Sequence, residues 1–346
     1  MKMTAAVLEE CGKPLQLLDL EIPKLKRGQV LVKIAYSAIC RSQLMEIGGH
    51  RGPDRWLPHL LGHEASGTVA EVGPEVTKVK PGDDVILTWI KSSGIESATP
   101  EYRHNGRTIN AGPITTFSNY SIVSENRVVS KPVELDMNVA VLFGCALATG
   151  SGMALHEIDP DPDSLILVLG LGGVGLAALL ALIATGRRNL LAADSDAAKC
   201  ALAESLGVTS IHLSTGPEAR PLLAKFAPDG VDYCIEAGGS IKTIELGFSI
   251  LNPNTGTLIF ASHPPQGDLI CLDPHELICG KNIRGSWGGA MSPDDDIPKL
   301  VKLFTDSETS LAWMTNQRFR LPEINAALAS FSDKRVIRPI LVMDHE

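Results

Sequence analysis

The sequence lacks the features that would place the protein in a membrane or on nucleic acid. Its longest apolar run, "GLAALLALIATG" at 175–186, is too short and too rich in glycine to cross a bilayer, and the N-terminal "MKMTAAVLEECGKP" has no apolar core of signal-peptide length. No run of lysine and arginine offsets the formal net charge of −9, which argues against nucleic acid or an anionic membrane as the main partner. We therefore expect a cytoplasmic protein that acts on a small molecule.

The cysteines also lack the spacing of a disulfide framework. There are 7, an odd number with no CxxC pair, so in a cytoplasmic chain reduced thiols or metal ligands are expected rather than disulfides. The 44% hydrophobic and 21% charged residues are those of an ordinary globular enzyme. Because 346 residues are many for one compact core, two domains are expected.

Two patterns divide the chain. Up to about residue 145, short β-rich runs such as "QVLVKIAYSAI" and "ASGTVAEVG" are separated by glycine and proline turns, which favours a β-barrel or sandwich. From about residue 164, fully apolar strands alternate with helical segments, which indicates a parallel sheet covered on both faces. After an acidic "SPDDD", a helical "IPKLVKLF" and a β-like "RPILVM" are expected to return to the first domain.

The turn "GLGGVG" carries the first chemical signal. It places Gly170, Gly172 and Gly175 in GxGxxG spacing, after the apolar strand "LILVL" and before a helix. Glycines there allow a tight turn, close approach of a pyrophosphate to backbone N–H groups and packing of the helix on the strand, and the helix N-terminus adds partial positive charge. We interpret the turn, including Gly173 and Val174, as a dinucleotide site; a glycine-rich turn without a ligand is the alternative.

Asp194 supports this interpretation. It ends the next apolar strand, 19 residues beyond Gly175, where a carboxylate can accept both adenosine-ribose hydroxyls. The same carboxylate would repel a 2′-phosphate, and the following Ser195 and Asp196 offer no arginine to receive one, so NAD is favoured over NADP. Lys199, one helical turn on, is expected either to reach the same ribose or to be a solvated helix lysine.

A family resemblance joins these signals. Taken singly, Cys40 is typical of a core thiol and His63 of a structural histidine. However, "GHEASGTVAEVG" through "KPGDDV", followed about a hundred residues later by "GLGGVG", resembles the zinc-dependent medium-chain alcohol dehydrogenases from roughly residue 25 to the end. The resemblance implies a GroES-like β-rich catalytic domain at 1–145 and 287–346, and a Rossmann domain with a doubly wound parallel sheet at 146–286.

The resemblance also implies a catalytic zinc. Its ligands would be Cys40, His63 and Cys145, with Glu64 as a nearby carboxylate that binds the metal transiently or is only structural. Two thiolates and an imidazole leave the fourth tetrahedral position open, and the cation can then lower the pKa of a bound water or alcohol. Polyol dehydrogenases of the superfamily typically have a glutamate in place of the second thiol, so Cys145 points toward alcohol and aldehyde chemistry.

Four more residues receive roles by the same resemblance, and three of them have a structural alternative. Arg41 would contact the pyrophosphate, or is a surface arginine. Ser42 would start the alcohol proton toward solvent. Thr149 would pack beneath the nicotinamide, or simply starts a helix. Trp89 would wall the substrate pocket, or caps the core.

The sequence departs from the family pattern in three places. No cysteine occurs in 91–120, where relatives hold a structural zinc, so one zinc per chain is expected. Gln43 stands where an aspartate normally supports the zinc histidine; an amide can orient the ring but adds little charge. Met45 replaces a histidine of the proton relay, which leaves ribose hydroxyls, water or His50 as the route.

The loop "HRGPDRW" at 50–56 borders the cleft in relatives. We expect its charged residues to be solvated; an anionic substrate is the alternative.

The sequence therefore predicts an NAD-dependent, zinc-containing alcohol dehydrogenase that forms a homodimer or homotetramer. Two alternatives stay open. One is a zinc-free enone or quinone reductase with the same fold, and the other is an NAD-binding protein without catalytic activity.

Overall fold

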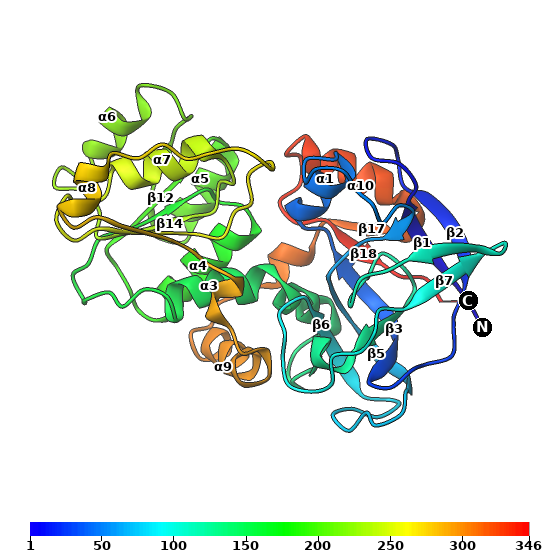
Figure 1. Ribbon diagram of the computed structural model, residues 1–346. Coiled ribbons are helices and arrows are strands. Elements are labelled where there is room, and N and C mark those ends of the chain that lie inside the picture. Colours follow the sequence, from blue (N-terminus) through cyan, green and yellow to red (C-terminus); the bar gives the residue numbers. More distant parts are fainter. Residues whose placement is uncertain (346) are drawn as a thin grey trace. The chain divides into compact units, whose positions relative to one another are not determined.

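The computed structural model describes residues 1–345 and divides the chain into two compact units (Figure 1). Unit 1 comprises Met1–Ala146, Ser292–Lys302 and the residues from Ser310 onward. Unit 2 comprises Leu147–Met291 and Leu303–Thr309.

Unit 1 is built mostly from antiparallel strands, with two parallel pairs. A closed barrel has the order β1-β2-β7-β8-β4, and a second sheet has the order β10-β6-β5-β3-β18-β17, with β9 also paired to β3. The barrel strands are β1 (Lys2–Leu8), β2 (Gln16–Glu21), β4 (His59–Leu60), β7 (Glu101–His104) and β8 (Arg107–Asn110). The second sheet consists of β3 (Gln29–Ala38), β5 (Glu64–Val72), β6 (Asp84–Thr88), β9 (Tyr120–Ser124), β10 (Val128–Ser130), β17 (Arg318–Arg320) and β18 (Ile340–Val342).

Strand β3 separates two apolar cores. Because successive side chains of a strand point to opposite faces, Val30 and Val32 enter one core while Leu31 enters the other. Both cores exclude water from β3, which explains why its sequence is nearly continuous in apolar residues instead of alternating with polar ones.

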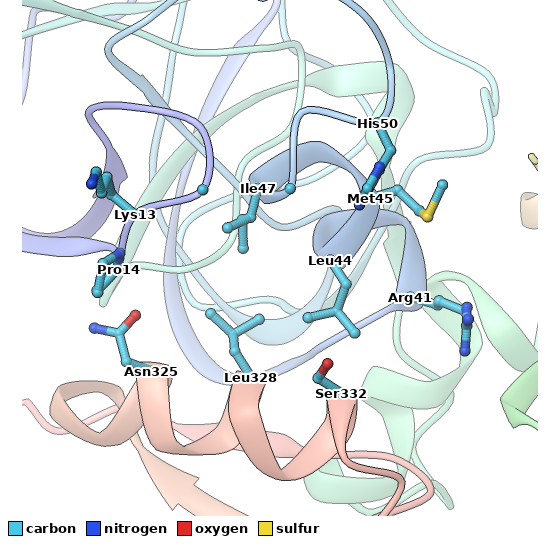
Figure 2. Close-up of a pocket in the computed structure, with 12 residues that line it drawn as sticks. Lys13, Pro14, Arg41, Leu44, Met45, Ile47, His50, Asn325, Leu328 and Ser332 are labelled. Carbon is cyan, nitrogen blue, oxygen red and sulfur yellow. The ribbon is translucent and has the colours of Figure 1, made fainter. Parts of the chain in front are cut away.

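Short helices complete unit 1. They are α1 (Arg41–Ile47), η1 (Glu125–Arg127), α2 (Met137–Ala140), η2 (Val141–Gly144), η4 (Ala312–Thr315), η5 (Leu321–Glu323) and α10 (Ile324–Ser332). Helix α10 buries Ile324, Ala327 and Leu328 in one of the two cores. At its start, the Asn325 side-chain amide exchanges two hydrogen bonds of 2.9 Å with the main chain of Leu15. A groove lies between α1 and α10 (Figure 2).

Unit 2 contains a parallel sheet with helices (Figure 1). Its strand order is β13-β12-β11-β14-β15-β16, and each neighbouring pair is parallel. The strands are β11 (Ile166–Leu169), β12 (Leu190–Asp194), β13 (Thr209–His212), β14 (Tyr233–Glu236), β15 (Thr257–Phe260) and β16 (Asn282–Gly285). The helices are α4 (Gly173–Ala184), α5 (Ala197–Ser205), α6 (Ala219–Ala224), α7 (Ile241–Ser249), α8 (Pro274–Ile278) and η3 (Gly288–Ala290). Helices α3 (Ala146–Leu155) and α9 (Pro293–Asp306) include residues of both units.

The order of this sheet creates a switch point. The chain runs from β11 to β12 and β13 on one side and returns to β14 on the other side of β11. In open parallel sheets, ligands bind where the order reverses, at the carboxyl ends of the strands. The end of β11 is therefore the expected ligand edge of unit 2.

The fold class predicted from the sequence is confirmed, with local differences. The barrel strands β1, β2, β7 and β8 are not predicted, and neither is α10. Helix α9 begins at Pro293, ahead of the expected "IPKLVKLF". Proline at the first helical position and three aspartates in the first turn both stabilise a helix N-terminus, so "SPDDD" opens the helix instead of preceding it.

Within residues 1–345, no single helix is long and apolar enough to cross a bilayer. Only the consecutive pair Met137–Gly144 and Ala146–Leu155 reaches the required length, across a bend, and residues 140–148 of this pair are buried in the protein.

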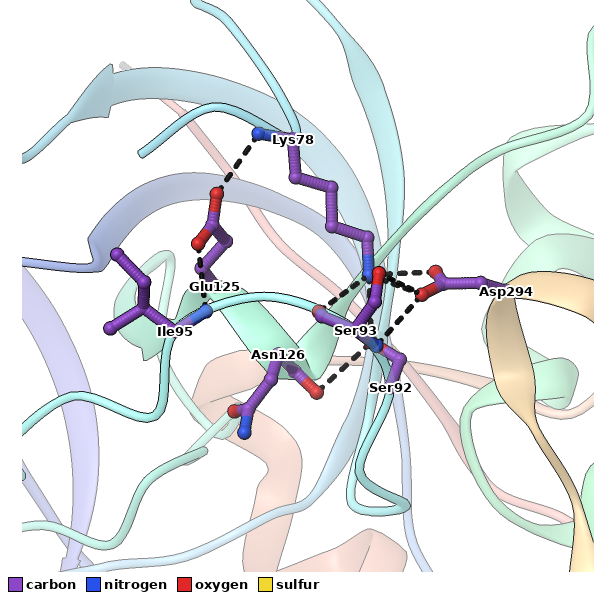
Figure 3. A network of polar contacts seen from close by, with 7 residues as sticks. All are labelled: Lys78, Ser92, Ser93, Ile95, Glu125, Asn126 and Asp294. Atoms are coloured by element: carbon purple, nitrogen blue, oxygen red, sulfur yellow. Dashed lines mark hydrogen bonds and ion pairs between the residues drawn. The ribbon is translucent and has the colours of Figure 1, made fainter. Parts of the chain in front are cut away.

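Two carboxylates hold the segment that lacks cysteines (Figure 3). Glu125 accepts hydrogen bonds from the backbone N–H groups of Thr77, Lys78 and Ile95 at 2.7, 2.9 and 2.8 Å. Asp294 accepts from the backbone and hydroxyl of Ser93 at 2.8 and 2.6 Å and from the Lys78 ammonium at 2.9 Å. Hydrogen bonds to carboxylates therefore fix this loop.

These hydrogen bonds shift the pKa values of both carboxylates in the same direction. Burial alone would raise the pKa of Glu125, but its backbone donors lower it below the usual 4.5. Burial likewise opposes the shift of Asp294, whose pKa is lowered by its bonds to Lys78 and Ser93. The contribution of the two carboxylates to the stability of the folded protein is therefore fully present above their unfolded-state pKa values. It is lost as the pH falls through their lower folded-state pKa values.

We expect Glu125→Gln to lower the free energy of unfolding by about 1–3 kcal/mol at pH 7, because the amide turns a donor toward one backbone N–H group and leaves it unsatisfied. The difference from wild type should shrink as the pH falls below 4.5, where the wild-type carboxylate loses its advantage. Urea unfolding at several pH values measures this difference in the free energy of unfolding. Glu134→Gln, at an exposed position, is the control, and equal midpoints for both variants would contradict the role of Glu125.

Candidate functional site

Four potential metal ligands meet in unit 1. One ligand atom each from Cys40, His63, Glu64 and Cys145 lies within 4.8 Å of all the others. Cys40 is the N-cap of α1, His63 and Glu64 stand at the start of β5, and Cys145 follows η2. The structure thus brings together the four residues that the sequence predicts as ligands.

Strand pairing explains how distant residues meet. Strands β3 and β5 are antiparallel, with Ser37 opposite Ala65, so the end of one lies beside the start of the other. Cys40 just after β3 and His63 just before β5 are consequently neighbours.

The thiols of Cys40 and Cys145 differ in pKa. Hydrogen bonding with Cys145 lowers the pKa of Cys40 well below its usual value, against burial, and His63 adds to the effect. The same hydrogen bond, together with burial, raises the pKa of Cys145 well above its usual value. Cys40 is therefore the thiol more readily held as thiolate, the form that binds metals.

The imidazole of His63 is held between sulfur and amide. Its Nε2 lies 3.2 Å from the Cys145 Sγ, and its Nδ1 lies 2.6 Å from the Gln43 Nε2. Burial would lower the pKa of His63, but the hydrogen bond and the charge of Cys40 raise it overall. Gln43 also accepts the backbone N–H of Cys40 through Oε1 at 3.0 Å, so one amide orients two of the potential ligands.

Beside the cluster lies a buried ion pair that the sequence analysis does not identify. Arg338 and Glu64 are both buried and bond through the Arg338 Nη2 and one carboxylate oxygen of Glu64. Burial raises the pKa of Glu64 to about 7, against the opposing charge of Arg338. Burial would lower the pKa of Arg338, but the negative charges around it raise it. The other Glu64 oxygen has no partner among the described residues.

Trp89 and Ser42 stand near the potential ligands. Trp89 follows β6, and its ring lies edge-on to His63 with centroids 6.5 Å apart. Ser42, two residues after Cys40, has a buried hydroxyl with no hydrogen-bond partner among residues 1–345. An unpaired buried hydroxyl is costly, so it fits a place where a ligand supplies the missing partner.

The glycine-rich turn lies at the switch point of unit 2. Gly170 has φ +94 and packs so closely on the backbone of Gly238 that no side chain fits there. A Cβ at Gly172, in contrast, would meet nothing within 4 Å, so this face of the turn is open to a ligand. Residues 173–175 then form the first turn of α4, whose free N–H groups can bind an anion.

Asp194 supports this turn directly. Its carboxylate accepts the backbone N–H groups of Leu171 at 2.6 Å and Asp196 at 2.9 Å, and the Lys199 ammonium lies 3.8 Å away. The structure thus brings the acid and the lysine together at the turn.

A second buried acid at the same edge is missed by the sequence analysis. Glu236, at the end of β14, accepts the N–H groups of Gly238 and Gly239 at 2.8 and 2.9 Å and the hydroxyls of Thr243 and Ser262 at 2.6 and 2.5 Å. It fixes the loop on which Gly170 packs. An acidic residue at the end of an apolar strand is the only sequence signal for it.

The remaining two candidates lie in different units. Arg41 is exposed at the start of α1 in unit 1, and Thr149 is buried in α3 in unit 2. The Thr149 hydroxyl has no partner among the described residues.

Comparison with known families gives a match in each half of the chain. Residues 26–133 match the alcohol dehydrogenase GroES-like domain, and residues 173–306 match the zinc-binding dehydrogenase family. Together the matches cover more than half of the chain.

Individual relatives match over nearly the full length. An S-(hydroxymethyl)glutathione dehydrogenase of Synechocystis is 26% identical over 99% of this chain and 100% of its own. Among solved structures, an alcohol dehydrogenase zinc-binding domain protein of Burkholderia ambifaria has a TM-score of 0.90 at 25% identity, with 100% of both chains covered. The benzyl alcohol dehydrogenase of Acinetobacter calcoaceticus has a TM-score of 0.88 at 24% identity, covering 99% of this chain and 100% of that one, and supports the fold alone.

Proposed function

Because this chain belongs to the zinc-dependent medium-chain alcohol dehydrogenase family, we propose that it transfers hydride between a primary or secondary alcohol and NAD, giving an aldehyde or ketone. The observation that carries the proposal is the meeting of two thiols, an imidazole and a carboxylate, contributed by distant parts of the chain, within 4.8 Å. In the same proposal, residues 1–145 and 287–346 are the catalytic domain and 146–286 is the NAD-binding domain.

Cys40, His63 and Cys145 would hold a single zinc, with Glu64 beside it. When bound, zinc acts as a Lewis acid that lowers the pKa of an alcohol hydroxyl. Gln43 orients the imidazole, and the lowered pKa of Cys40 favours its thiolate. Ser42 accepts the alcohol proton through its unpaired hydroxyl and passes it toward solvent. Trp89 walls the substrate pocket.

In the same proposal, NAD binds through the residues that the sequence predicts for it. The open face at Gly172 and the start of α4 receive the pyrophosphate, with Arg41 as a further contact. Asp194 and Lys199 bind the adenosine ribose, and Thr149 contacts the nicotinamide. NAD supplies the hydride acceptor.

Assembly and location are part of the proposal. Strand β16 ends the sheet of unit 2, and Leu269 and Ile278 of that unit are 85% and 82% exposed. An unpaired edge strand and exposed apolar side chains favour association, so we propose a homodimer or homotetramer. All seven cysteines are unbridged, which supports a cytoplasmic location.

Cys145→Ser should abolish zinc binding and alcohol oxidation, since a serine hydroxyl is a poor zinc ligand. Zinc content by mass spectrometry and NAD reduction with a panel of primary, secondary and sugar-linked alcohols measure both effects. The matched control is Cys200→Ser, also at a buried cysteine. Wild-type protein that lacks zinc and reduces enones would support the zinc-free reductase instead. Cofactor binding without turnover, unchanged in Cys145→Ser, would support a non-catalytic protein.

Gln43→Glu should tighten zinc binding by about tenfold, in the range found for residues that orient metal ligands. With zinc on Nε2, the Nδ1 of His63 carries a proton that needs an acceptor, but the single oxygen of Gln43 already accepts from Cys40. A carboxylate of the same length accepts from both. Competition with a chromogenic chelator measures the affinity, with Gln16→Glu as an exposed control. Zinc binding no tighter than in wild type would show that the amide already suffices.

Asp194→Ser should shift the ratio of kcat/KM for NADP to that for NAD upward by about tenfold or more, because the charge that repels a 2′-phosphate is removed. Initial rates with both cofactors measure the ratio. Asp229→Ser, on the exposed surface of the same unit, should leave it unchanged. A wild-type preference for NADP would refute the role of Asp194.

A further inference from the structure

The buried acid Glu236, at the carboxyl end of β14, has no cation beside it. It is 0% exposed, and no lysine or arginine within residues 1–345 forms an ion pair with it. Burying a carboxyl group is costly unless hydrogen bonds compensate, and a buried charge is normally paired. The reason for an acid at this place therefore lies in the groups that it binds.

All hydrogen bonds of Glu236 come from donors at the same edge of the sheet. Its Oε1 accepts the N–H groups of Gly238 at 2.8 Å and Gly239 at 2.9 Å, and the hydroxyl of Thr243 at 2.6 Å. Its Oε2 accepts the hydroxyl of Ser262, just after β15, at 2.5 Å. One oxygen thus fixes the loop that follows β14, and the other ties this loop to the neighbouring strand end.

The glycine-rich turn rests on this loop. A Cβ on Gly170 would lie 2.4 Å from the Gly238 nitrogen and 2.7 Å from the carbonyl carbon of Ala237. A Cβ on Gly175 would lie 3.3 Å from the Cβ of Ala237. Because backbone packs on backbone at Gly170, a displacement of the loop would also displace the turn.

The same turn is held from its other side by a second acid. Strand β11, which leads into the turn, lies between β12 and β14 in the sheet. Asp194, at the end of β12, accepts the Leu171 N–H of the turn directly at 2.6 Å. Glu236 acts from β14 through the loop. The turn is therefore fixed from both neighbouring strands.

We propose that Glu236 is a positioning residue for the cofactor. By holding the loop on which Gly170 packs, it sets the place of the N–H groups that receive the pyrophosphate. This role rests on the proposed function, in which NAD binds at Gly172 and the start of α4. Glu236 itself need not touch NAD. N–H groups that are already in place lose little freedom when the phosphates arrive, so holding them raises affinity.

Two substitutions of Glu236 test this role by calorimetric titration of the full chain with NAD. Glu236→Met has a similar length but no oxygen, so the N–H groups of the loop lose their acceptor and the Kd for NAD should rise about tenfold. Glu236→Gln keeps one oxygen for these N–H groups and turns its NH2 toward Ser262, whose hydroxyl can also accept; its Kd should stay within about twofold of wild type.

Steady-state rates give a second readout of Glu236→Met. With an alcohol that the wild type oxidises, the KM for NAD should rise while kcat stays within about twofold, because the loss concerns binding of the cofactor and not the hydride step.

Cys234→Ser is the matched control. Cys234 is also fully buried, lies two residues earlier on β14 and forms no hydrogen bond with the loop. A hydroxyl in that apolar core should lower thermal stability and leave the Kd for NAD unchanged. If Glu236→Met does not fold, Thr243→Val replaces it; loss of one of the three donors to Oε1 should raise the Kd about threefold.

Three results would overturn the role of Glu236 while the proposed function stands. They are an unchanged Kd in Glu236→Met and Thr243→Val, an equal loss of affinity in Cys234→Ser, and a Glu236→Gln variant that binds NAD as weakly as Glu236→Met. A wild type that binds no NAD would overturn both the positioning role and the proposed function.

Discussion

The buried ion pair of Glu64 and Arg338 is the constraint on which unit 1 depends. Glu64 opens β5 and Arg338 lies two residues before the start of β18, so the pair connects segments 274 residues apart beside the potential metal ligands. Removing one partner of such a pair costs about 3–5 kcal/mol, because the other charge is left buried without compensation. The pair therefore requires the last part of the chain to return to the first sheet, next to the strand that leads to Cys40.

The sequence predicts the features that can be recognised from neighbouring residues and misses those that depend on the folded structure. Apolar strands, the glycine turn and Asp194 are visible because each lies within a few residues of its own structural context. The barrel strand β2 has one buried residue, Leu20, so its alternation is too weak to identify it. Arg338 acts through Glu64, a partner 274 residues away that only the fold brings to it. Glu236 has three partners nearby in the sequence, Gly238, Gly239 and Thr243, but the sequence does not show that its side chain turns back to them.

Strand pairing brings the potential ligands Cys40 and His63 together. Nothing in the spacing of Cys40, His63 and Cys145 requires proximity; the family resemblance suggested it, and the antiparallel pairing of β3 with β5 provides it for the first two. The loop without cysteines is fixed in another way. Where a metal would join side chains to each other, Glu125 accepts only backbone N–H groups, and Asp294 accepts the backbone N–H and hydroxyl of Ser93 and the ammonium of Lys78.

Helix α1 is only seven residues long, well below the length at which an isolated helix is stable in water. Its position must therefore come from what packs on either side of it. One side presents Ser42 and Gln43 near the potential metal ligands, and the other forms a wall of the groove beside α10. Such a short element cannot move on one face without moving on the other. Helix α1 thus contributes residues to both the groove and the cluster of potential metal ligands, and a displacement of the helix would change both.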